Sequence, residues 1–248
     1  MKENDLLRQI DHRPFPPRRS TWVMRQGWKD LLFLHYKVPY ELVRKAVPPE
    51  LELDHYHNSY WVSISPFKMR HVKLRWLPPI PTTYNFLELN FRTYVTHNEK
   101  PGIYFFSLDT SSSLAAIAAR MAFLPYFRAS MSVKSDGNGF CFTSHRKGSK
   151  KVPGDLEVAY SPHPEKFFAE KGSLTYWLVE RYCLFQKAFN SKVVSIDIHH
   201  LPWELQSADA DVSKNSLTES IGLQVDGQQP LIHYSNFQKV LVWPPQLK

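Results

Sequence analysis

Three polar side chains that could bind an anion or move a proton occupy alternate positions of one apolar segment. Glu88, Asn90 and Arg92 alternate with Leu89 and Phe91. A period of two is typical of a β-strand, so the polar side chains share one face and the apolar side chains share the other. The polar face is either solvated on the outside of a sheet or lines the interior of a barrel, where buried charges need partners.

Glu88 and Arg92 are too far apart along such a strand to pair with each other. Four residues of extended chain span about 13 Å, so each side chain needs a partner from elsewhere. Cross-strand pairing with Arg120, Arg181 or Asp109 would make the two residues structural. Alternatively, Arg92 binds the carboxylate or phosphate of a small ligand, because a guanidinium offers two parallel donors to two oxygens.

Three further residues are predicted to lie in or near the same pocket: Tyr94, Arg120 and Arg181. Arg120 lies beside the apolar stripe of a helix predicted over 113–124, so its stem can be buried while its head reaches a cavity. Arg181 follows another predicted helix. It is either a second cavity cation or a structural partner of Glu180 or Asp109.

Two adjacent histidines, His199 and His200, end a predicted strand. Neighbouring residues of a strand point to opposite faces, so the pair is not expected to ligate one metal ion. A histidine here remains a possible general acid or base, and the catalytic candidates are Glu88 and His200. No other metal-ligand spacing and no glycine-rich phosphate loop occurs, so neither a metal nor a cofactor is predicted.

Short strands joined by turns must position these side chains. Strands are predicted over 31–36, 60–68, 85–96, 103–108, 128–133, 139–144, 193–201 and 234–243, and residues 156–160 are predicted to be extended. Helices are predicted over 40–47, 113–124 and 174–178, the last with Ser173 as its N-cap. Residues 206–230 are polar and weakly patterned, with one short helix over 216–223.

Strands outnumber helices in this prediction, and no composition break divides the chain. The expected organisation is an N-terminal arm, residues 1–27, followed by one domain, residues 28–248. The expected fold class is mainly β (α+β), an antiparallel sheet closed into a barrel or cone with a few peripheral helices.

The composition favours a globular protein of the cytoplasm. The 248 residues are 43% hydrophobic and 14% aromatic, which suffices for a sizeable core. No apolar run is long enough to span a bilayer, and the first residues lack the apolar run of a secretory signal. The only cysteines, Cys141 and Cys183, make neither a disulfide framework nor a zinc site, and both are predicted to be buried, inert thiols.

The net charge of +8 is concentrated in two segments, residues 13–19 and 145–151. A basic protein can attract nucleic acid, an anionic membrane or small anions. No recognition helix, zinc finger or stacking motif accompanies the two segments, so they are interpreted as a solvated arm and an exposed hairpin loop. Nucleic-acid association therefore stays an alternative and is not the main prediction.

Several motifs resemble a known family. Residues 34–54 are similar to the entry segment of the acetoacetate decarboxylase superfamily, with a strand, a short helix and an extended exit. Residues 90–95, 105–109, 180–182 and 199–203 resemble the uncharacterised YqjF-like branch of that superfamily. The resemblance covers roughly residues 20–245. It implies a cone-shaped β-barrel around a cavity, with helices packed outside and the polar face of strand 85–96 turned inward.

The resemblance does not carry over the decarboxylase chemistry. Family decarboxylases form a Schiff base through a lysine whose pKa a neighbouring lysine lowers, within the segment that corresponds to residues 111–126. That segment has no lysine here. Its only basic residue is Arg120, which stays protonated and cannot form an imine. Lys37 matches an arginine that the decarboxylases carry after the first strand, but one cation does not rebuild the mechanism.

The sequence thus predicts a cytoplasmic β-barrel protein that binds a small organic acid or related metabolite in its central cavity, without Schiff-base lysine chemistry. Three alternatives stay open: a lyase-type enzyme acting on a keto-acid-like substrate, a non-catalytic ligand sensor, and a basic protein associated with nucleic acid. The expected partner is an anionic small molecule. No membrane partner is expected, and a homo-oligomer is left open.

Overall fold

The structure, a computed structural model, describes all residues except 1–2, 121–122, 149–151, 190–191 and 226, and it leaves the side chains of residues 82 and 118–120 undescribed. The strands are β1 (Met24–Val38), β2 (Glu52–Leu53), β3 (Tyr60–Leu74), β4 (Phe86–His97), β5 (Lys100–Thr110), β6 (Tyr126–Ser135), β7 (Phe140–Arg146), β8 (Leu156–Phe168), β9 (Cys183–Lys187), β10 (Val193–His199), β11 (Glu204–Asn215), β12 (Leu231–Val242) and β13 (Gln246–Leu247). The helices are α1 (Glu3–Arg8), α2 (Tyr40–Ala46), α3 (Pro81–Tyr84), α4 (Ser113–Arg120), α5 (Leu174–Val179) and the 3-10 turn η2 (Thr218–Ile221).

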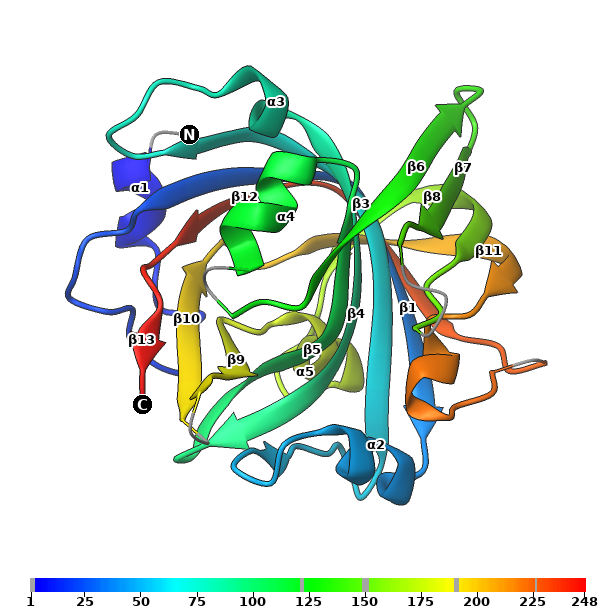
Figure 1. The fold of residues 1–248 in the computed structure, drawn as a ribbon, viewed down its shortest axis with the longest axis horizontal. Coiled ribbons are helices and arrows are strands. Elements are labelled where there is room, and N and C mark those ends of the chain that lie inside the picture. The colour runs from blue at the N-terminus through cyan, green and yellow to red at the C-terminus, as the bar shows by residue number, and fades with distance from the viewer. Residues whose placement is uncertain (1–2, 121–122, 149–151, 190–191, 226) are drawn as a thin grey trace.

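The described strands form one 13-stranded sheet that curls on itself (Figure 1). Its order is β13-β10-β9-β5-β6-β7-β8-β11-β12-β1-β3-β4-β2, with additional pairings between β10 and β12 and between β5 and β4. β5 runs parallel to β6 and β9, whereas the long ladders of β1, β3, β4, β8 and β12 are antiparallel. The ladders β5–β9 and β10–β12 contain two residue pairs each, so the curled sheet is joined there over only a short height, and the full closure expected from the sequence is not shown.

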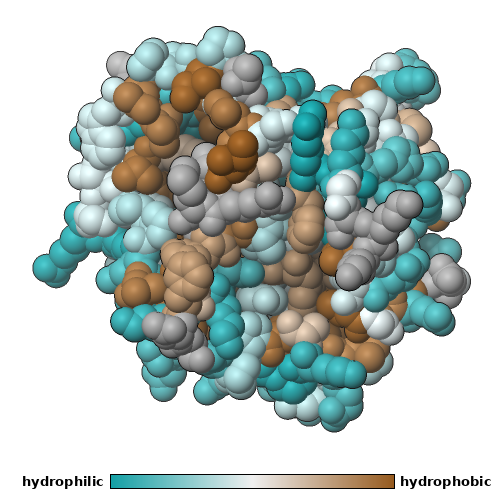
Figure 2. Space-filling model, viewed as in Figure 1, coloured by the Kyte–Doolittle hydropathy of each residue, from teal (hydrophilic) through white to brown (hydrophobic). Residues whose placement is uncertain are grey.

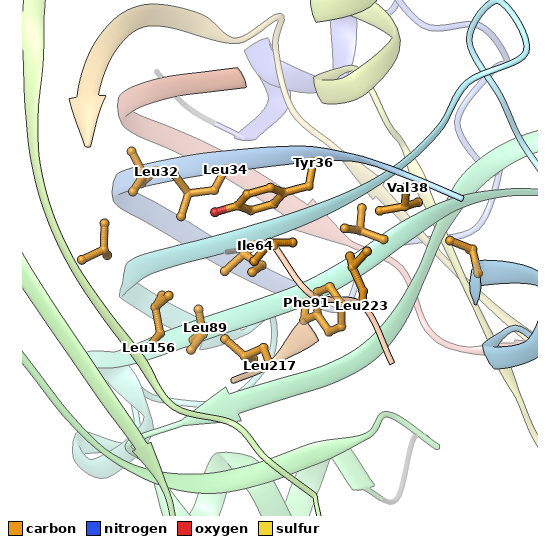
Figure 3. Packing of buried hydrophobic residues seen from close by; sticks show 14 of the residues in the cluster. Leu32, Leu34, Tyr36, Val38, Ile64, Leu89, Phe91, Leu156, Leu217 and Leu223 are labelled. Atoms are coloured by element: carbon orange, nitrogen blue, oxygen red, sulfur yellow. The ribbon is translucent and has the colours of Figure 1, made fainter. Parts of the chain in front are cut away.

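Strands β1, β3 and β4 form a wall with both faces buried. On one face, Leu34, Ile64 and Phe91 join an apolar core that includes residues of β8 and β11 (Figure 3). On the other face, Phe33 and Phe86 turn toward the barrel interior and pack in a second core with α5. The alternation of β4 therefore serves two compartments, because its apolar residues fill the first core while its polar residues face the barrel.

The predicted mainly β fold is confirmed, and so are three of the helices. α2, α4 and α5 begin where the sequence predicts, and Ser173 Oγ accepts the N–H of Tyr176 at 3.2 Å as the N-cap of α5. Part of the predicted end of α4 falls on residues 121–122, outside the described residues. The helix predicted over 216–223 is only the short turn η2.

The prediction is wrong for residues 206–215, which belong to the long strand β11. This strand pairs with β8, and β8 continues through Pro162 and Pro164. Ala208, Ala210 and Val212 turn inward and are buried or half-buried, so the period of two exists there in small side chains. Alanine gives little hydrophobic contrast, and the neighbouring charges make such a strand look like a loop.

The N-terminal arm is not solvated as the sequence predicted, because two of its arginines are bound to β10. Arg13 is 9% exposed, and its Nη1 donates to Ile198 O at 2.8 Å and to His199 Nδ1 at 3.0 Å. Arg18 forms an ion pair with Asp197 at 2.8 Å. Both cations are held by groups of the fold, which removes them from any surface that could attract nucleic acid.

The second basic segment is likewise not simply an exposed loop. Arg146 lies at the end of β7, and its side chain donates two hydrogen bonds of 2.6 Å to Asp109 of β5. Both side chains are almost wholly buried, at 2% and 0% exposure. Residues 149–151 lie outside the described residues, so the interpretation of the loop itself stays a prediction.

Candidate functional site

A cavity of about 420 Å³ lies inside the barrel. Its wall is built mainly from β1, β3, β4, β5 and β10, and most of its side chains are apolar. The polar residues that matter for the following argument are Glu88, Asn90, Arg92, Tyr126, Arg181 and His200. Small-molecule sites have roughly 300–1,000 Å³ and combine an apolar lining with a few polar groups, so this cavity has the size and composition of such a site.

The polar row of β4 faces this cavity. Glu88, Asn90 and Arg92 are 2%, 6% and 7% exposed, and all three line it. Of the two orientations that the sequence left open, the structure therefore has the interior one. Tyr94 continues the row beyond the cavity wall, and its hydroxyl lies 3.2 Å from His35 Nδ1.

Glu88 is a buried carboxyl group without a cation beside it among the described residues. Tyr126 Oη donates a hydrogen bond to Glu88 Oε2 at 2.8 Å. Burial raises the pKa of Glu88 to about 8, although the hydrogen bonds from Tyr126 and Asn90 act in the opposite direction. Glu88 therefore holds a proton through most of the neutral range, and a carboxyl group with this pKa can donate or accept a proton there.

Arg92 is a buried guanidinium that has no counter-ion among the described residues. Its Cζ lies 5.5 Å from the centroid of the Phe33 ring, and its only described side-chain hydrogen bond is shared with Tyr94. Its Nε is buried and has no hydrogen-bond partner, and no carboxylate of a described residue lies within 4.0 Å. Burial lowers the pKa of Arg92, but a guanidinium in a protein keeps its charge. The site therefore holds a positive charge, and the Arg92 Nε–H group has no acceptor.

Arg181 lies at the same end of the cavity but has a partner of its own. Its Nη1 donates to Asp54 Oδ2 at 2.6 Å, and its Nε donates to Trp177 O at 2.7 Å. Its Nη2 is buried and unpartnered. The partners proposed from the sequence are wrong, because Glu180 accepts from Trp203 N at 2.9 Å and Asp109 is taken by Arg146. Arg181 is thus partly neutralised by Asp54, and one of its guanidinium nitrogens, Nη2, has no partner.

His200 lines the cavity, whereas His199 does not. Both ring nitrogens of His200 lie near carbonyl oxygens, with Nδ1 2.7 Å from Leu201 O and Nε2 3.4 Å from Arg181 O. Burial lowers the pKa of His200 to about 3, so it is uncharged at neutral pH and a weak base. His199 turns to the arm, where its Nε2 lies 2.9 Å from Leu6 O. The two rings therefore point apart, as the strand pattern predicts.

The remaining candidates lie elsewhere. Arg120 is the last residue of α4, and its side chain is outside the described part. Lys37 is exposed, so the counterpart of the family arginine is not in the cavity. A different lysine, Lys73 of β3, lines the cavity and is half-buried. The prediction of a buried thiol is wrong for Cys141, which is exposed, while Cys183 is buried.

Sequence reasoning missed three polar residues around the site. Tyr126 reaches Glu88 because β6 lies parallel to β5, and Asp54 reaches Arg181 from a loop 127 residues away in the chain. His35 is buried beneath Tyr94 with its Nε2 unpartnered. Only the tertiary pairing of distant segments brings these groups together, so no local pattern could have indicated them. Among the described residues, no group of three or more His, Cys, Asp or Glu side chains is arranged to hold a metal ion.

The curled sheet and its internal cavity define a protein with the acetoacetate decarboxylase-like fold. The structure is similar to the enduracididine biosynthesis enzyme MppR complexed with pyruvate, at a TM-score of 0.64, 12% identity and coverage of 94% of this chain and 95% of that chain. It is also similar to acetoacetate decarboxylase from Legionella pneumophila, at a TM-score of 0.61, 11% identity and coverage of 98% and 94%. An acetoacetate decarboxylase-like enzyme from Sphingomonas wittichii RW1 matches at a TM-score of 0.62, 10% identity and coverage of 92% and 94%.

The chain belongs to the DUF2071 family, described as an uncharacterized conserved protein, which matches residues 25–239. It is 46% identical over 226 residues to the uncharacterized protein YqjF of Bacillus subtilis, covering 91% of this chain and 92% of that protein. The resemblance to the YqjF-like branch is therefore confirmed. No helix among the described residues is long and apolar enough to cross a membrane.

Proposed function

We propose that the cavity binds a small organic anion and that Arg92 receives its carboxylate. The supporting observation is the state of Arg92, a guanidinium 7% exposed with a buried, unpartnered Nε. A buried charge without a counter-ion is costly, and a carboxylate that accepts two parallel hydrogen bonds would relieve that cost. Arg181, with its unpartnered Nη2, is the second donor. The pyruvate held by the structurally similar MppR supports an oxo acid as one class of ligand.

A lyase-type enzyme acting on a keto-acid-like substrate is the second candidate function. The observation in its favour is Glu88, whose pKa of about 8 suits proton transfer and which lines the same cavity as Arg92. His200 is less suited to this role, since its pKa of about 3 makes it a weak base. A non-catalytic sensor would use the same Arg92 contact without turning the ligand over.

Isothermal titration with pyruvate, acetoacetate and octanoate tests the binding proposal. Wild-type protein is compared with Arg92→Met and with Arg128→Met, an exposed arginine on β6 that serves as the matched control. At least one acid is expected to bind the wild type and the control, with the affinity lowered at least about tenfold in Arg92→Met, as for loss of a charge-assisted hydrogen bond. Equal affinity in Arg92→Met, or no binding by any acid, would contradict the proposal.

Imine chemistry is tested separately by borohydride trapping with pyruvate or acetoacetate. The mass of the protein is expected to stay unchanged, because α4 carries no lysine. Among the described residues that line the cavity, Lys73 is the one lysine, and it is half-buried. An adduct on Lys73 that disappears in Lys73→Arg would overturn the view that the site works without a Schiff base.

A further inference from the structure

The cavity is longer than a three-carbon acid requires. Phe86, Glu88, Asn90 and Arg92 line it in succession along one face of β4. Alternate residues of a strand lie about 7 Å apart, so the row from the first to the last covers roughly 20 Å. A volume of about 420 Å³ over that length describes an elongated space with room for a chain-like molecule.

One end of this space is polar and positively charged. Arg92 and Arg181 meet there, because the Arg181 guanidinium lies 5.0 Å from the ring centroid of Tyr94, the next residue of the row. Arg181 also lies 4.4 Å from the centroid of Trp177. Aromatic rings and two guanidinium groups with buried, unpartnered nitrogens therefore form the inner end, where a carboxylate fits.

The other end is apolar and opens between β3, α3 and α4. Leu77, Ile80 and Leu114 line the cavity and are 48%, 41% and 50% exposed. Trp76 and Ile117 lie on the same segments and are 69% and 59% exposed. Figure 2 shows apolar side chains gathered over this region of the surface. An apolar opening above a charged base matches a molecule with a charged head and an apolar tail.

Asn90, between the two ends, adds a requirement for a hydrogen-bond donor. Its side chain is 6% exposed and lines the cavity, and its Oδ1 is buried without a partner. The amide shares a hydrogen bond with Glu88, which leaves Oδ1 free to accept from a ligand. A hydroxyl group on the ligand supplies that donor, whereas a plain hydrocarbon chain leaves a buried acceptor unsatisfied.

We infer that the ligand is an elongated amphipathic hydroxy acid, an inference that rests on the proposed carboxylate binding. Its carboxylate lies between Arg92 and Arg181, its hydroxyl group donates to Asn90 Oδ1, and its apolar chain runs toward Leu77 and Leu114. This assignment names the substrate class for the same site and makes the apolar opening part of it.

Titration with butanoate, hexanoate, octanoate and decanoate tests the apolar chain. The dissociation constant is expected to fall about fourfold with each added methylene that is buried in the cavity. Leu77→Asp should weaken the binding of decanoate more than the binding of butanoate, whereas Leu247→Asp, exposed and outside the cavity lining, should bind both acids as wild type does. Equal affinity for butanoate and decanoate, with binding still lost in Arg92→Met, overturns this inference alone. Absence of binding by every acid overturns the proposed function as well.

The hydroxyl group is tested by comparing racemic 3-hydroxyoctanoate with octanoate. The hydroxy acid is expected to bind about threefold to tenfold more tightly to the wild type, from one additional hydrogen bond. Asn90→Leu should bring the ratio of the two affinities close to one. Equal or tighter binding of octanoate by the wild type overturns the assignment of Asn90.

Discussion

Arg92 is a side chain whose surroundings disfavour its own charge in the absence of a ligand. It is 7% exposed, lies near Phe33 and has no carboxylate beside it among the described residues. Replacing a buried charged group with an apolar group of similar volume is often neutral or stabilising. The proposed ligand would therefore bind to a residue whose charge destabilises the ligand-free fold.

Arg92→Met is accordingly expected to raise the free energy of unfolding by about 1–3 kcal/mol without ligand. Urea unfolding of the ligand-free proteins measures this change, with Arg128→Met as the control for loss of an exposed arginine. A marked loss of stability in Arg92→Met would mean that its contact with Tyr94 is structural and that the charge is already compensated.

Glu88 gives the protein a particular dependence of stability on pH. Its pKa is raised from 4.5 to about 8, so the folded state binds the proton more tightly than the unfolded state. Between these two values the unfolded carboxyl group ionises first, and the free energy of unfolding falls as the pH rises. Below about pH 4.5 both states are protonated, and the contribution no longer changes.

Glu88→Gln removes this titration. The stability of the variant relative to wild type is expected to increase by roughly 3–5 kcal/mol between pH 5 and pH 8, since each pKa unit corresponds to about 1.4 kcal/mol. Unfolding in urea at several pH values measures the difference, with the exposed Glu165→Gln as the carboxylate control. A difference that is independent of pH would show that the pKa of Glu88 is not raised in the folded protein.

At the scale of elements, the buried ion pair between Asp109 and Arg146 joins β5 to the end of β7. Its side chains are 0% and 2% exposed. Asp109→Leu leaves the buried Arg146 charge without its counter-ion, with only the carbonyl oxygens of Val152 and Pro153 as acceptors, and is expected to lower the free energy of unfolding by about 3–5 kcal/mol. The double variant Asp109→Leu/Arg146→Met should recover most of that loss in urea unfolding. If the double variant is as unstable as the single variant, the ion pair fixes the position of β7 relative to β5 in a way that apolar side chains cannot replace.

The parallel contact between β5 and β9 depends on Gly102. A Cβ atom there would lie 2.7 Å from Cys183 O and 2.7 Å from the Phe185 ring, so the two strands would have to separate. Gly102→Ala is expected to lower the free energy of unfolding by about 1–3 kcal/mol, as overpacking does. Faster amide exchange at Leu184 and Phe185 should accompany the loss. If stability and amide exchange are both unchanged, β5 and β9 can move apart at Gly102 without cost to the fold.

Local sequence patterns predict the elements whose pattern is strong. β4 has bulky apolar residues opposite polar ones, and α5 has a serine cap, so both were predicted. β11 was missed because its inward side chains include Ala208 and Ala210, and β8 was missed beyond Tyr160 because it contains prolines. These prolines follow the last pair between β7 and β8, so a missing N–H on that side breaks no ladder.

For the whole molecule, the sequence could indicate the polar row but not the groups that complete the site. Alternation placed Glu88 and Arg92 on one face, and the resemblance to a cone-shaped barrel implied that this face points inward. Tyr126, Asp54 and His35 come from distant strands and loops, where position is fixed by sheet pairing. The fold tolerates buried polar residues on one face of β4, because the opposite face of β1, β3 and β4 packs in a separate apolar core.

A direct test of carboxylate binding follows the Arg92 guanidinium itself. Arginine labelled with ¹⁵N gives an Nε–H resonance for Arg92, which the spectrum of Arg92→Met assigns. Addition of an acid that binds, such as decanoate, is expected to move this resonance, since the buried Nε gains an acceptor. An Arg92 resonance that stays in place while calorimetry records binding of the acid would contradict the account.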